Sequence, residues 1–166
     1  MDARTSKRQK RISKTQEMHA AIDLRGRLEA ASGAAKFGGG DVRVQGKTRL
    51  ECKVTEKGEY SVKLADLEKV QKQAARSLEA PVLQFAFRDR LGKMDKYAVI
   101  PFVMGDDEVR PQVTTNKSIT LHQDQIRYIL LVEQKRLRLE FRGKAYEKRY
   151  EVLSWNQYLE LQKGEG

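Results

Sequence analysis

The sequence predicts an α/β fold in which helices flank a central mixed sheet, with a C-terminal extension made of a β-hairpin and a helix. Two observations predict it. Segments whose apolar residues recur every three or four positions are interspersed with shorter segments in which apolar and polar residues alternate. Hydrophobic residues make up 39% of the 166 residues, enough for one modest core. We therefore expect one domain with additional terminal segments.

The N-terminal region begins with a basic stretch. Residues 1–14 are predicted to form a flexible basic arm, which either contacts phosphates or acts as a solubilising tail. A helix is expected to begin near Ser13 or Thr15, since either side chain can cap it, and to end before Ser32. Residues 32–40 are rich in glycine and predict a loop, but they lack the spacing of a nucleotide-binding P-loop.

The central region, residues 15–105, is predicted to form the core. After the first helix, a two-stranded hairpin, a helix with one apolar face and two more strands indicate a sheet with helices packed on it. The predicted elements are, in order, strands 41–45 and 48–55, helix 63–78 and strands 82–88 and 97–104.

Residues 106–166 predict a C-terminal extension packed on the core. We expect this extension to be a smaller unit, and the sequence shows no internal repeat. Its predicted elements are a polar loop at 106–116, strand 118–121, helix 123–134, strands 137–142 and 146–153, and a final helix capped by Ser154.

The amino-acid composition indicates which partners suit the protein and which sites its single cysteine excludes. Lys and Arg number 33 and Asp and Glu 23, a net charge of +10. Such a surplus suits a nucleic acid or an anionic membrane as partner, although a merely soluble basic protein has the same composition. A single cysteine, Cys52, excludes an intrachain disulfide and a cysteine zinc cluster. No apolar run approaches the ~20 residues that span a bilayer, and none follows the basic start, so we expect a cytoplasmic protein.

The predicted hairpin holds a group of residues suited to chemistry. Asp41 begins its first strand, and Glu51 and Lys53 lie in the second. Because side chains alternate across a strand, Glu51 and Lys53 share one face and Cys52 points to the other. Two carboxylates suit a hard divalent cation that lowers the pKa of a bound water, and an ammonium group can orient that water. The pattern predicts Mg²⁺-dependent phosphodiester hydrolysis, with Mn²⁺ as a substitute; a solvent-facing strand of alternating charges is the alternative.

Two short segments, GDV (residues 40–42) and ECK (51–53), resemble the motifs of the PD-(D/E)XK nuclease superfamily. More narrowly, residues 51–57 (ECKVTEK) are similar to a pattern of archaeal-type Holliday junction resolvases, some of them phage-encoded. The resemblance covers roughly residues 13–87; no Pro precedes Asp41, and the C-terminal extension has no counterpart. It implies a PD-(D/E)XK nuclease core, Mg²⁺ as cofactor, branched DNA as substrate and a homodimer with paired sites. For a phage-encoded member it implies the host cytoplasm.

The resemblance also implies roles for particular residues. The family's first-helix glutamate, which contacts the metal through water, matches Glu17, with Glu29 as second choice; a first-turn carboxylate that favours the helix dipole is the alternative for Glu17. The family's loop serine matches Ser32, and a glutamine on the next helix matches Gln71 or Gln73. The expected catalytic residues are thus Glu17, Ser32, Asp41, Glu51 and Lys53, and the expected metal ligands are Glu17, Asp41, Glu51 and Cys52.

DNA is expected to be recognised through its backbone and branched shape. A second basic cluster, in residues 135–149, either extends the DNA surface or is the solvated side of a two-stranded ribbon. The candidate dimer faces, the strand with Leu83, Phe85 and Phe87 and the helix with Trp155 and Tyr158, read equally well as core. The residues expected to contact phosphates are Lys7, Arg8, Lys10, Arg11, Lys36, Arg43 and Lys57.

The sequence as a whole predicts a structure-selective DNA endonuclease that resolves four-way junctions. One alternative is another PD-(D/E)XK nuclease, of the restriction or repair type. The other is a non-catalytic basic DNA-binding protein.

Overall fold

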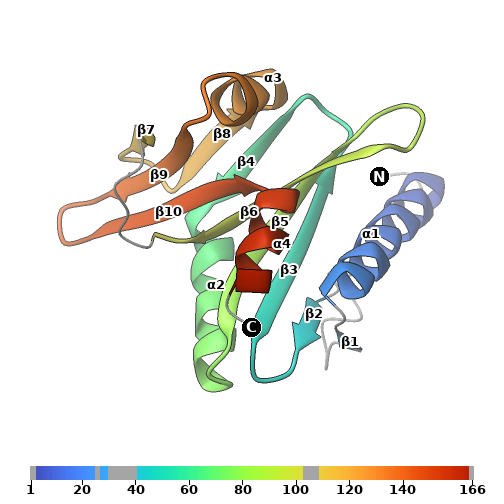
Figure 1. Ribbon diagram of the computed structural model, residues 1–166. Helices are drawn as coiled ribbons and strands as arrows, with labels where there is room; N and C mark the ends of the chain where they lie inside the picture. Colours follow the sequence, from blue (N-terminus) through green and yellow to red (C-terminus); the bar gives the residue numbers. More distant parts are fainter. Residues whose placement is uncertain (1–2, 25–26, 30–40, 103–108, 165–166) are drawn as a thin grey trace.

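The computed structural model describes residues 3–24, 27–29, 41–102 and 109–164, and for residues 3, 27–29 and 41 it describes the backbone alone (Figure 1). Its helices and strands are, in chain order, α1 (Ala3–Leu24), β1 (Arg27–Glu29), β2 (Asp41–Val44), β3 (Thr48–Thr55), β4 (Glu59–Lys63), α2 (Leu64–Arg76), β5 (Ala80–Arg88), β6 (Met94–Pro101), β7 (Val109–Thr114), β8 (Ser118–His122), α3 (Gln123–Arg127), the π-helical turn η2 (Tyr128–Val132), β9 (Arg136–Arg142), β10 (Glu147–Ser154) and α4 (Trp155–Gly164).

A mixed sheet flanked by helices confirms the predicted α/β class. Within the described ranges, eight strands form this sheet in the order β1-β2-β3-β5-β6-β10-β9-β7. β3 runs parallel to β5 and β7 runs parallel to β9, whereas the other neighbours are antiparallel. β4 and β8 pair in a separate two-stranded sheet. The central strand β5 is buried at six consecutive positions, as expected for a strand covered on both faces.

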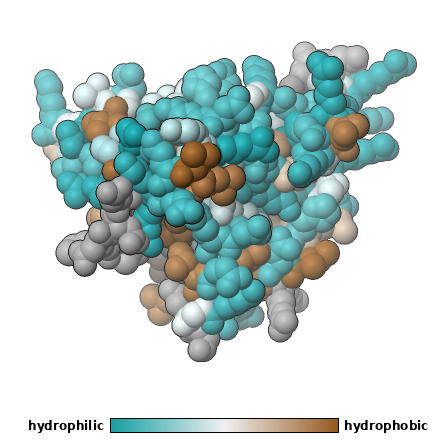
Figure 2. Space-filling model, turned by 45° about the horizontal axis from the view of Figure 1, so that its top comes forward, coloured by the Kyte–Doolittle hydropathy of each residue, from teal (hydrophilic) through white to brown (hydrophobic). Residues whose placement is uncertain are grey.

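Two layers of apolar side chains hold the helices on the large sheet. On one face, α2, α3 and the β4–β8 pair pack through residues such as Leu67 and Ile126 onto Phe85. On the other face, α1 and α4 pack through Ala20 and Trp155. We call these the α2 face and the α1 face. Hydrophilic residues predominate on the side of the molecule shown in Figure 2, and hydrophobic groups there are small and separate. None of the described helices is both long enough and apolar enough to cross a membrane.

α1 corrects the prediction for the N-terminal region. The helix begins at Ala3, so the prediction of a flexible arm was wrong for the described residues 3–14. Ile12, Gln16 and Ala20 follow one another at four-residue spacing, and all three are buried. This stripe packs one side of the helix on the sheet, while the basic side chains between these positions stay in solvent.

Three strands, β1, β4 and β7, were not predicted. β1 has three residues, too few for an alternating pattern. β4 is largely exposed, and Val62 is its one buried residue. β7 occupies much of the segment 106–116, which was predicted to be a loop because it is polar, and the strand includes Pro111. Among the described strands, β7 is at one edge of the sheet, which is where proline is tolerated.

The fold contains a repeat of elements that the sequence pattern does not show. The first unit (48–101) comprises β3, β4, α2, β5 and β6, and the second unit (109–154) comprises β7, β8, α3 with η2, β9 and β10. Both units have a parallel strand pair joined through the helix, followed by an antiparallel strand. Lys63 and His122, which precede the two helices, have nearly identical backbone angles (φ −96°, ψ 131° and φ −96°, ψ 133°).

A pseudo-twofold axis relates the two units. β6 pairs with β10 and β4 with β8 across this axis, both antiparallel. The first residues of the two helices exchange equivalent hydrogen bonds. The N–H of Leu64 donates to the carbonyl of Lys117, and the N–H of Gln123 donates to the carbonyl of Gly58, both at 2.9 Å. The two units therefore contact each other as two copies of one subunit would.

Equivalent positions in the two units carry opposite charges. Glu68 on α2 binds Lys148 on β10 at 2.8 Å, and Arg127 on α3 binds Asp95 on β6 at 2.9 Å. Glu68 and Arg127 each lie four residues after the start of their helix, and Lys148 and Asp95 occupy matching strand positions. Each ion pair joins the helix of one unit to a strand of the other. This reversal of sign at equivalent positions explains why the sequence does not reveal the repeat.

Candidate active site

Backbone pairing brings three acidic positions into one row. In the antiparallel register of β1, β2 and β3, Glu29 lies opposite Asp41 and Asp41 lies opposite Glu51. Positions that oppose each other in an antiparallel pair are on the same face of a sheet. Lys53 lies two residues after Glu51 on β3 and therefore on that face, which is the α2 face.

The carboxylate of Glu51 is buried between two lysine side chains. Its side chain is 4% exposed, with Lys53 Nζ 3.2 Å from Oε1 and Lys69 Nζ 3.6 Å from Oε2. These ammonium groups offset the cost of removing the carboxylate from water. Lys69 belongs to α2 and was not predicted as a site residue, because it lies outside the two short segments 40–42 and 51–53. Only the packing of α2 over β3 brings it to Glu51.

A tyrosine lies over the same part of the α2 face. Tyr60 on β4 stacks on Phe85 with ring centroids 5.0 Å apart, and Phe85 is the β5 partner of Lys53. Burial raises the pKa of the Tyr60 hydroxyl, and the nearby carboxylates of Asp66 and Glu51 raise it further. Tyr60 therefore keeps its proton at neutral pH and can donate a hydrogen bond.

α1 fixes the backbone of the lysine strand from the opposite face. The Nε2 of the buried Gln16 donates to the carbonyl of Lys53 at 2.8 Å and to Oε1 of Gln84 at 3.0 Å. Glu17, the next residue, is also buried. Because α1 begins at Ala3, Glu17 is in the middle of the helix, and its alternative role as a first-turn carboxylate was wrong. The helix thus holds Glu17 next to a residue that contacts Lys53.

Cys52 lies on the α1 face, as the alternation predicted. It is buried in the core cluster with Ala20 and Trp155, and its Sγ is 3.7 Å from Oε1 of Gln84. Glu51 and Lys53 are on the other face of β3. The Cys52 thiol is therefore not positioned to bind a metal beside Glu51.

The remaining predicted site residues are Ser32, Gln71 and Gln73. Ser32 is outside the described residues. Gln71 accepts a hydrogen bond at 2.7 Å from the hydroxyl of Tyr150, whose pKa burial raises to about 12. Gln71 is thus directed to the second unit. Gln73 lies one helical turn after Lys69 and lines a shallow groove with it on the surface of α2, so of the two glutamines it is the one near the lysine that reaches Glu51.

Comparison with known proteins does not assign a family. No protein-family model matches the chain, and no curated protein matches it either. The assignment of a function therefore depends on the residues and their geometry.

The donor set of the acidic row suits a hard divalent cation. Among the described side chains, no three His, Cys, Asp or Glu residues come together, and the side chains of Glu29 and Asp41 lie outside that description. The row offers carboxylates and no histidine or thiolate, which is the chemistry that Mg²⁺ and Mn²⁺ prefer. Asp41 and Glu51 would hold such a cation, and Glu29 is the neighbouring acidic position of the row. Glu17 belongs to α1, which packs on the α1 face, so its helix lies on the other side of the sheet from the row.

The second unit shows what the fold itself requires at these positions. Glu51 lies 13 residues before the start of α2, and Arg110 lies 13 residues before the start of α3. By the same count Gln112 is equivalent to Lys53. Arg110 binds Glu133 with two hydrogen bonds of 2.7 and 3.0 Å. The repeated unit therefore forms without a buried carboxylate or a lysine at these two strand positions.

The residues expected to contact phosphates differ in their surroundings. Arg43 is bound to the buried carboxylate of Glu79 at 2.6 Å, which Arg49 also approaches at 3.6 Å, so Arg43 has an internal structural role. Lys36 is outside the described residues. The others are exposed on α1 or in the turn after β3, namely Lys7, Arg8, Lys10, Arg11 and Lys57.

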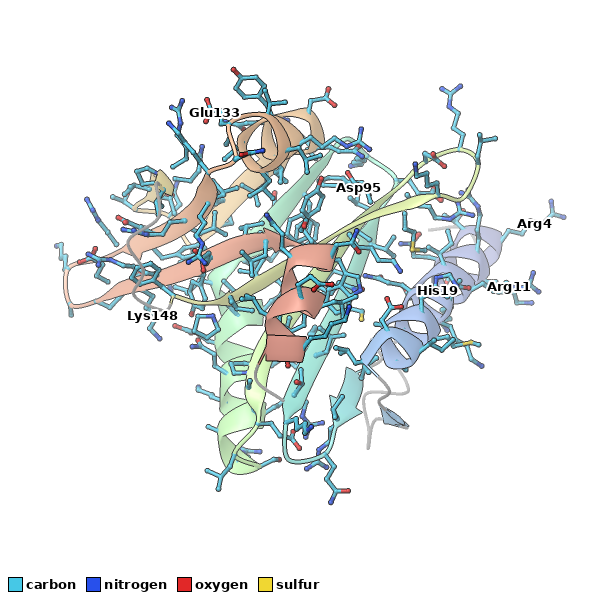
Figure 3. The ribbon with its side chains drawn as sticks, in the orientation of Figure 1. Arg4, Arg11, His19, Asp95, Glu133 and Lys148 are labelled. Carbon is cyan, nitrogen blue, oxygen red and sulfur yellow. The ribbon has the colours of Figure 1, made fainter. Side chains whose placement is uncertain are left out.

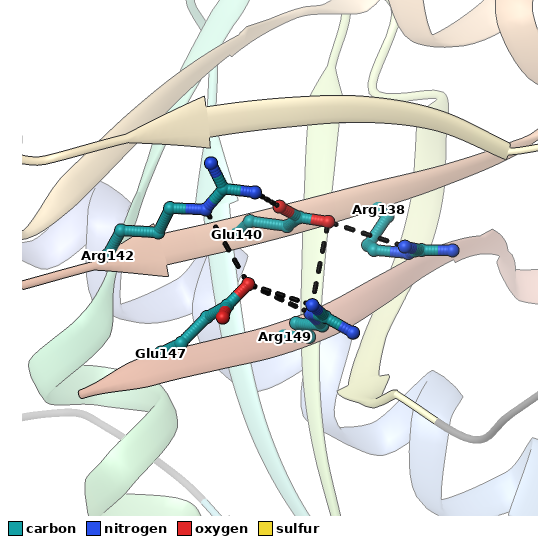
Figure 4. Close-up of polar contacts among 5 residues, drawn as sticks. All are labelled: Arg138, Glu140, Arg142, Glu147 and Arg149. Carbon is teal, nitrogen blue, oxygen red and sulfur yellow. Dashed lines mark hydrogen bonds and ion pairs between the residues drawn. The ribbon is translucent and has the colours of Figure 1, made fainter.

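The C-terminal basic cluster forms a lattice of ion pairs on β9 and β10 (Figure 4). The buried carboxylate of Glu140 contacts Arg142 at 2.8 Å, Arg138 at 3.3 Å and Arg149 at 4.0 Å. Glu147 contacts Arg149 at 2.9 Å and Arg142 at 3.5 Å. Positive and negative side chains alternate across the two strands and largely neutralise one another. The lattice therefore favours a solvated ribbon face over an extension of the DNA surface.

Neither candidate dimer face lies on the surface. Leu83, Phe85 and Phe87 are buried beneath α2 and β4. Trp155 and Tyr158 are buried beside α1, and the indole Nε1 of Trp155 donates to a carboxylate oxygen of Asp23 on α1 at 2.8 Å. Of the two alternatives that the sequence left open, dimer face or core, the structure supports core for both stripes, because each is covered by another element of the same chain.

Proposed function

We propose that the protein is a metal-dependent DNA endonuclease of the PD-(D/E)XK type that resolves four-way junctions. The proposed metal-dependent chemistry rests on one observation. The strand register sets Asp41 opposite Glu51, and Lys53 Nζ lies 3.2 Å from the buried Glu51 carboxylate. Sequence spacing alone allowed a solvent-facing strand of alternating charges, and the burial of Glu51 argues against that alternative.

The second unit supports a functional reason for these residues. Its equivalent positions hold Arg110 and Gln112, so packing of the repeated unit does not demand a carboxylate and a lysine. Burying a carboxylate costs free energy, and the second unit avoids that cost at the position equivalent to Glu51. A chemical requirement in the first unit accounts for the difference.

Each residue has a defined role in the proposed site. Asp41 and Glu51 would hold Mg²⁺, which when bound polarises a phosphoryl oxygen and lowers the pKa of a water molecule. Lys53 is placed to orient the attacking water and to stabilise the charge that develops on the phosphate. Lys69 offsets the charge of Glu51 before a cation binds.

The element order and charge support a nuclease acting on DNA. The helix, the Asp41 strand, the Glu51 strand, the next helix and the following strand occur in the order of the PD-(D/E)XK superfamily. The net charge of +10 suits a polyanion. The resolvase assignment and the homodimer rest on the similarity of residues 51–57 to archaeal-type resolvases.

Cleavage of labelled DNA tests both parts of the proposal. A four-way junction and a linear duplex of matching sequence are incubated with the protein in Mg²⁺, Mn²⁺ or EDTA. We expect paired cuts in the junction, dependent on the metal, and little cutting of the duplex. Equal cutting of both substrates would favour a nuclease of the restriction or repair type. If neither substrate is cut although DNA is bound, the protein is a non-catalytic DNA-binding protein.

A further inference from the structure

We infer that a basic groove between α1 and the β5–β6 hairpin binds the sugar–phosphate backbone of a DNA duplex. The inference rests on the proposed function for the identity of the polyanion. Binding in the groove requires neither metal nor cleavage, so it can be tested separately.

The groove lies where the N-terminal half of α1 meets the hairpin. It has a volume of about 280 Å³ and is lined by Arg8, Arg11 and His19 from the helix and by Arg88 and Gly92 from the hairpin. In Figure 1 the tip of the β5–β6 hairpin reaches toward the first turns of α1. Both sides of the groove therefore present cationic groups to whatever occupies it.

One carboxylate holds the two sides together. Arg8 approaches Glu56 Oε1 at 2.9 Å, and Arg88 approaches the same oxygen at 3.2 Å. The Arg8 side chain remains 63% exposed. A guanidinium has five N–H donors, so each arginine keeps donors for a further acceptor. Two cations on one carboxylate leave a net positive charge, to which Arg11 adds.

The hairpin turn is fixed by its own hydrogen bonds. Asp89 Oδ1 accepts from the N–H groups of Leu91 at 2.9 Å and Lys93 at 2.8 Å. Gly92 has φ +85°, and a Cβ there would lie 3.3 Å from a terminal nitrogen of Arg88. The glycine thus allows the turn and leaves space for the Arg88 guanidinium. A fixed turn loses little conformational entropy when it binds a ligand.

The surface around the groove holds much of the positive charge of the chain. Residues 3–14, 56–57 and 88–93 together contain ten Lys and Arg and two acidic residues. In Figure 3, Arg4 and Arg11 extend from α1 into solvent, away from the sheet. Both acidic residues are engaged, Glu56 by the arginines and Asp89 by the turn. The field at this surface therefore favours a polyanion.

A DNA backbone fits this surface better than an anionic membrane does. A helix that binds a membrane surface directs its apolar side to the lipid. The apolar stripe of α1 instead packs on the sheet, with Ile12 and Ala20 buried. The exposed side of the N-terminal half of α1 is polar and charged, which suits phosphates in solution.

Binding in EDTA tests the inference with a fluorescent duplex and the full-length chain. The test variant is Arg8→Gln/Arg11→Gln/Arg88→Gln. The matched control, Lys117→Gln/Lys144→Gln/Lys163→Gln, removes the same charge from exposed positions elsewhere. We expect the groove variant to bind at least tenfold more weakly and the control within twofold of the unmodified protein. The slope of log K against log salt should lose about 0.9 for each phosphate contact removed.

A second variant and a second ligand keep the inference open to refutation. Arg11→Gln leaves the contacts of Glu56 in place and should still weaken binding at least threefold. Equal binding by the groove variant and the control would overturn the inference, and so would binding to phosphatidylserine vesicles in preference to DNA. If the inference fails while Mg²⁺-dependent cleavage persists, the proposed function stands. If cleavage is absent while the groove variant loses DNA binding, the proposed function fails and the inference stands.

Discussion

Two buried glutamates are predicted to respond in opposite ways to the same substitution. Glu51 and Glu140 are both nearly inaccessible, at 3% and 4% exposure. Changing either to glutamine keeps the size of the side chain and removes its charge. Their surroundings differ, so Glu51→Gln is expected to abolish cleavage with little effect on stability, and Glu140→Gln to lower stability.

The magnitudes follow from the partners of each carboxylate. The lysines at Glu51 have side chains 35% and 53% exposed, so they can turn to water when the carboxylate is neutralised. Loss of these ion pairs lowers the free energy of unfolding by about 0–1 kcal/mol. Glutamine also avoids the cost of burying a charge, which raises the free energy of unfolding. The two effects oppose each other, so the net change should be less than about 1 kcal/mol. Glu140 contacts three arginines, and the side chain of Arg138 is only 21% exposed, so that guanidinium stays partly buried when the carboxylate charge is removed. Removing a partner from a buried ion pair costs about 3 kcal/mol, equivalent to a fall of about 6–12 °C in Tm for a chain of this size.

Thermal unfolding by circular dichroism and single-turnover cleavage measure the two effects on the same samples. We expect Glu51→Gln to unfold within about 4 °C of the unmodified protein and to lose metal-dependent cleavage, because a carboxylate that would hold the metal is gone. Glu140→Gln should unfold earlier and cleave normally while folded. If Glu51→Gln unfolds as early as Glu140→Gln and loses only the activity that its unfolded fraction explains, Glu51 has a structural role and no catalytic one.

Three further substitutions probe other parts of the structure. Lys69→Gln removes a cation that would compete with the metal for Glu51, and the attraction between Lys69 and Glu51 is about 1 kcal/mol at the surface. The Mg²⁺ concentration for half-maximal cleavage should therefore fall about fivefold. An unchanged concentration would show that Lys69 does not compete with the metal. The hydrogen bond from Lys148 lowers the pKa of Glu68. The contribution of Glu68 to stability is therefore present above its ordinary pKa and is lost as pH falls through the lowered value. In urea unfolding, Lys148→Ala should lose less stability than the unmodified protein as pH falls below 4.5. Gly92→Ala forces a side chain to φ +85° and should cost about 1 kcal/mol in urea unfolding, with an unchanged midpoint counting against the strained turn.

The sequence predicted the first unit well because its signals are local. The alternation in residues 48–55 and the helical stripe of residues 63–78 are the patterns on which strand and helix predictions depend. They placed Glu51 and Lys53 on one face and Cys52 on the other, as the structure has them.

Contacts between distant residues could not be predicted in this way. Lys69 reaches Glu51 only because α2 packs on β3, and the pairing of Glu29 with Asp41 depends on strand register. The repeat was hidden because equivalent ion pairs reverse their charges, as Glu68 and Arg127 do. The helix over residues 3–14 was missed because its buried stripe is narrow and the residues between are basic.

Direct titration of Mn²⁺ into the protein tests whether Asp41 and Glu51 form a metal site, without any DNA substrate. Electron paramagnetic resonance reports free Mn²⁺, and the variants are Asp41→Asn, Glu51→Gln and Lys53→Ala. We expect one Mn²⁺ per chain, loss of binding in both carboxylate variants and retained binding in Lys53→Ala. Because the second unit holds Arg110 where the first holds Glu51, no second ion is expected there. Unchanged Mn²⁺ binding by Glu51→Gln would show that Glu51 does not bind the metal.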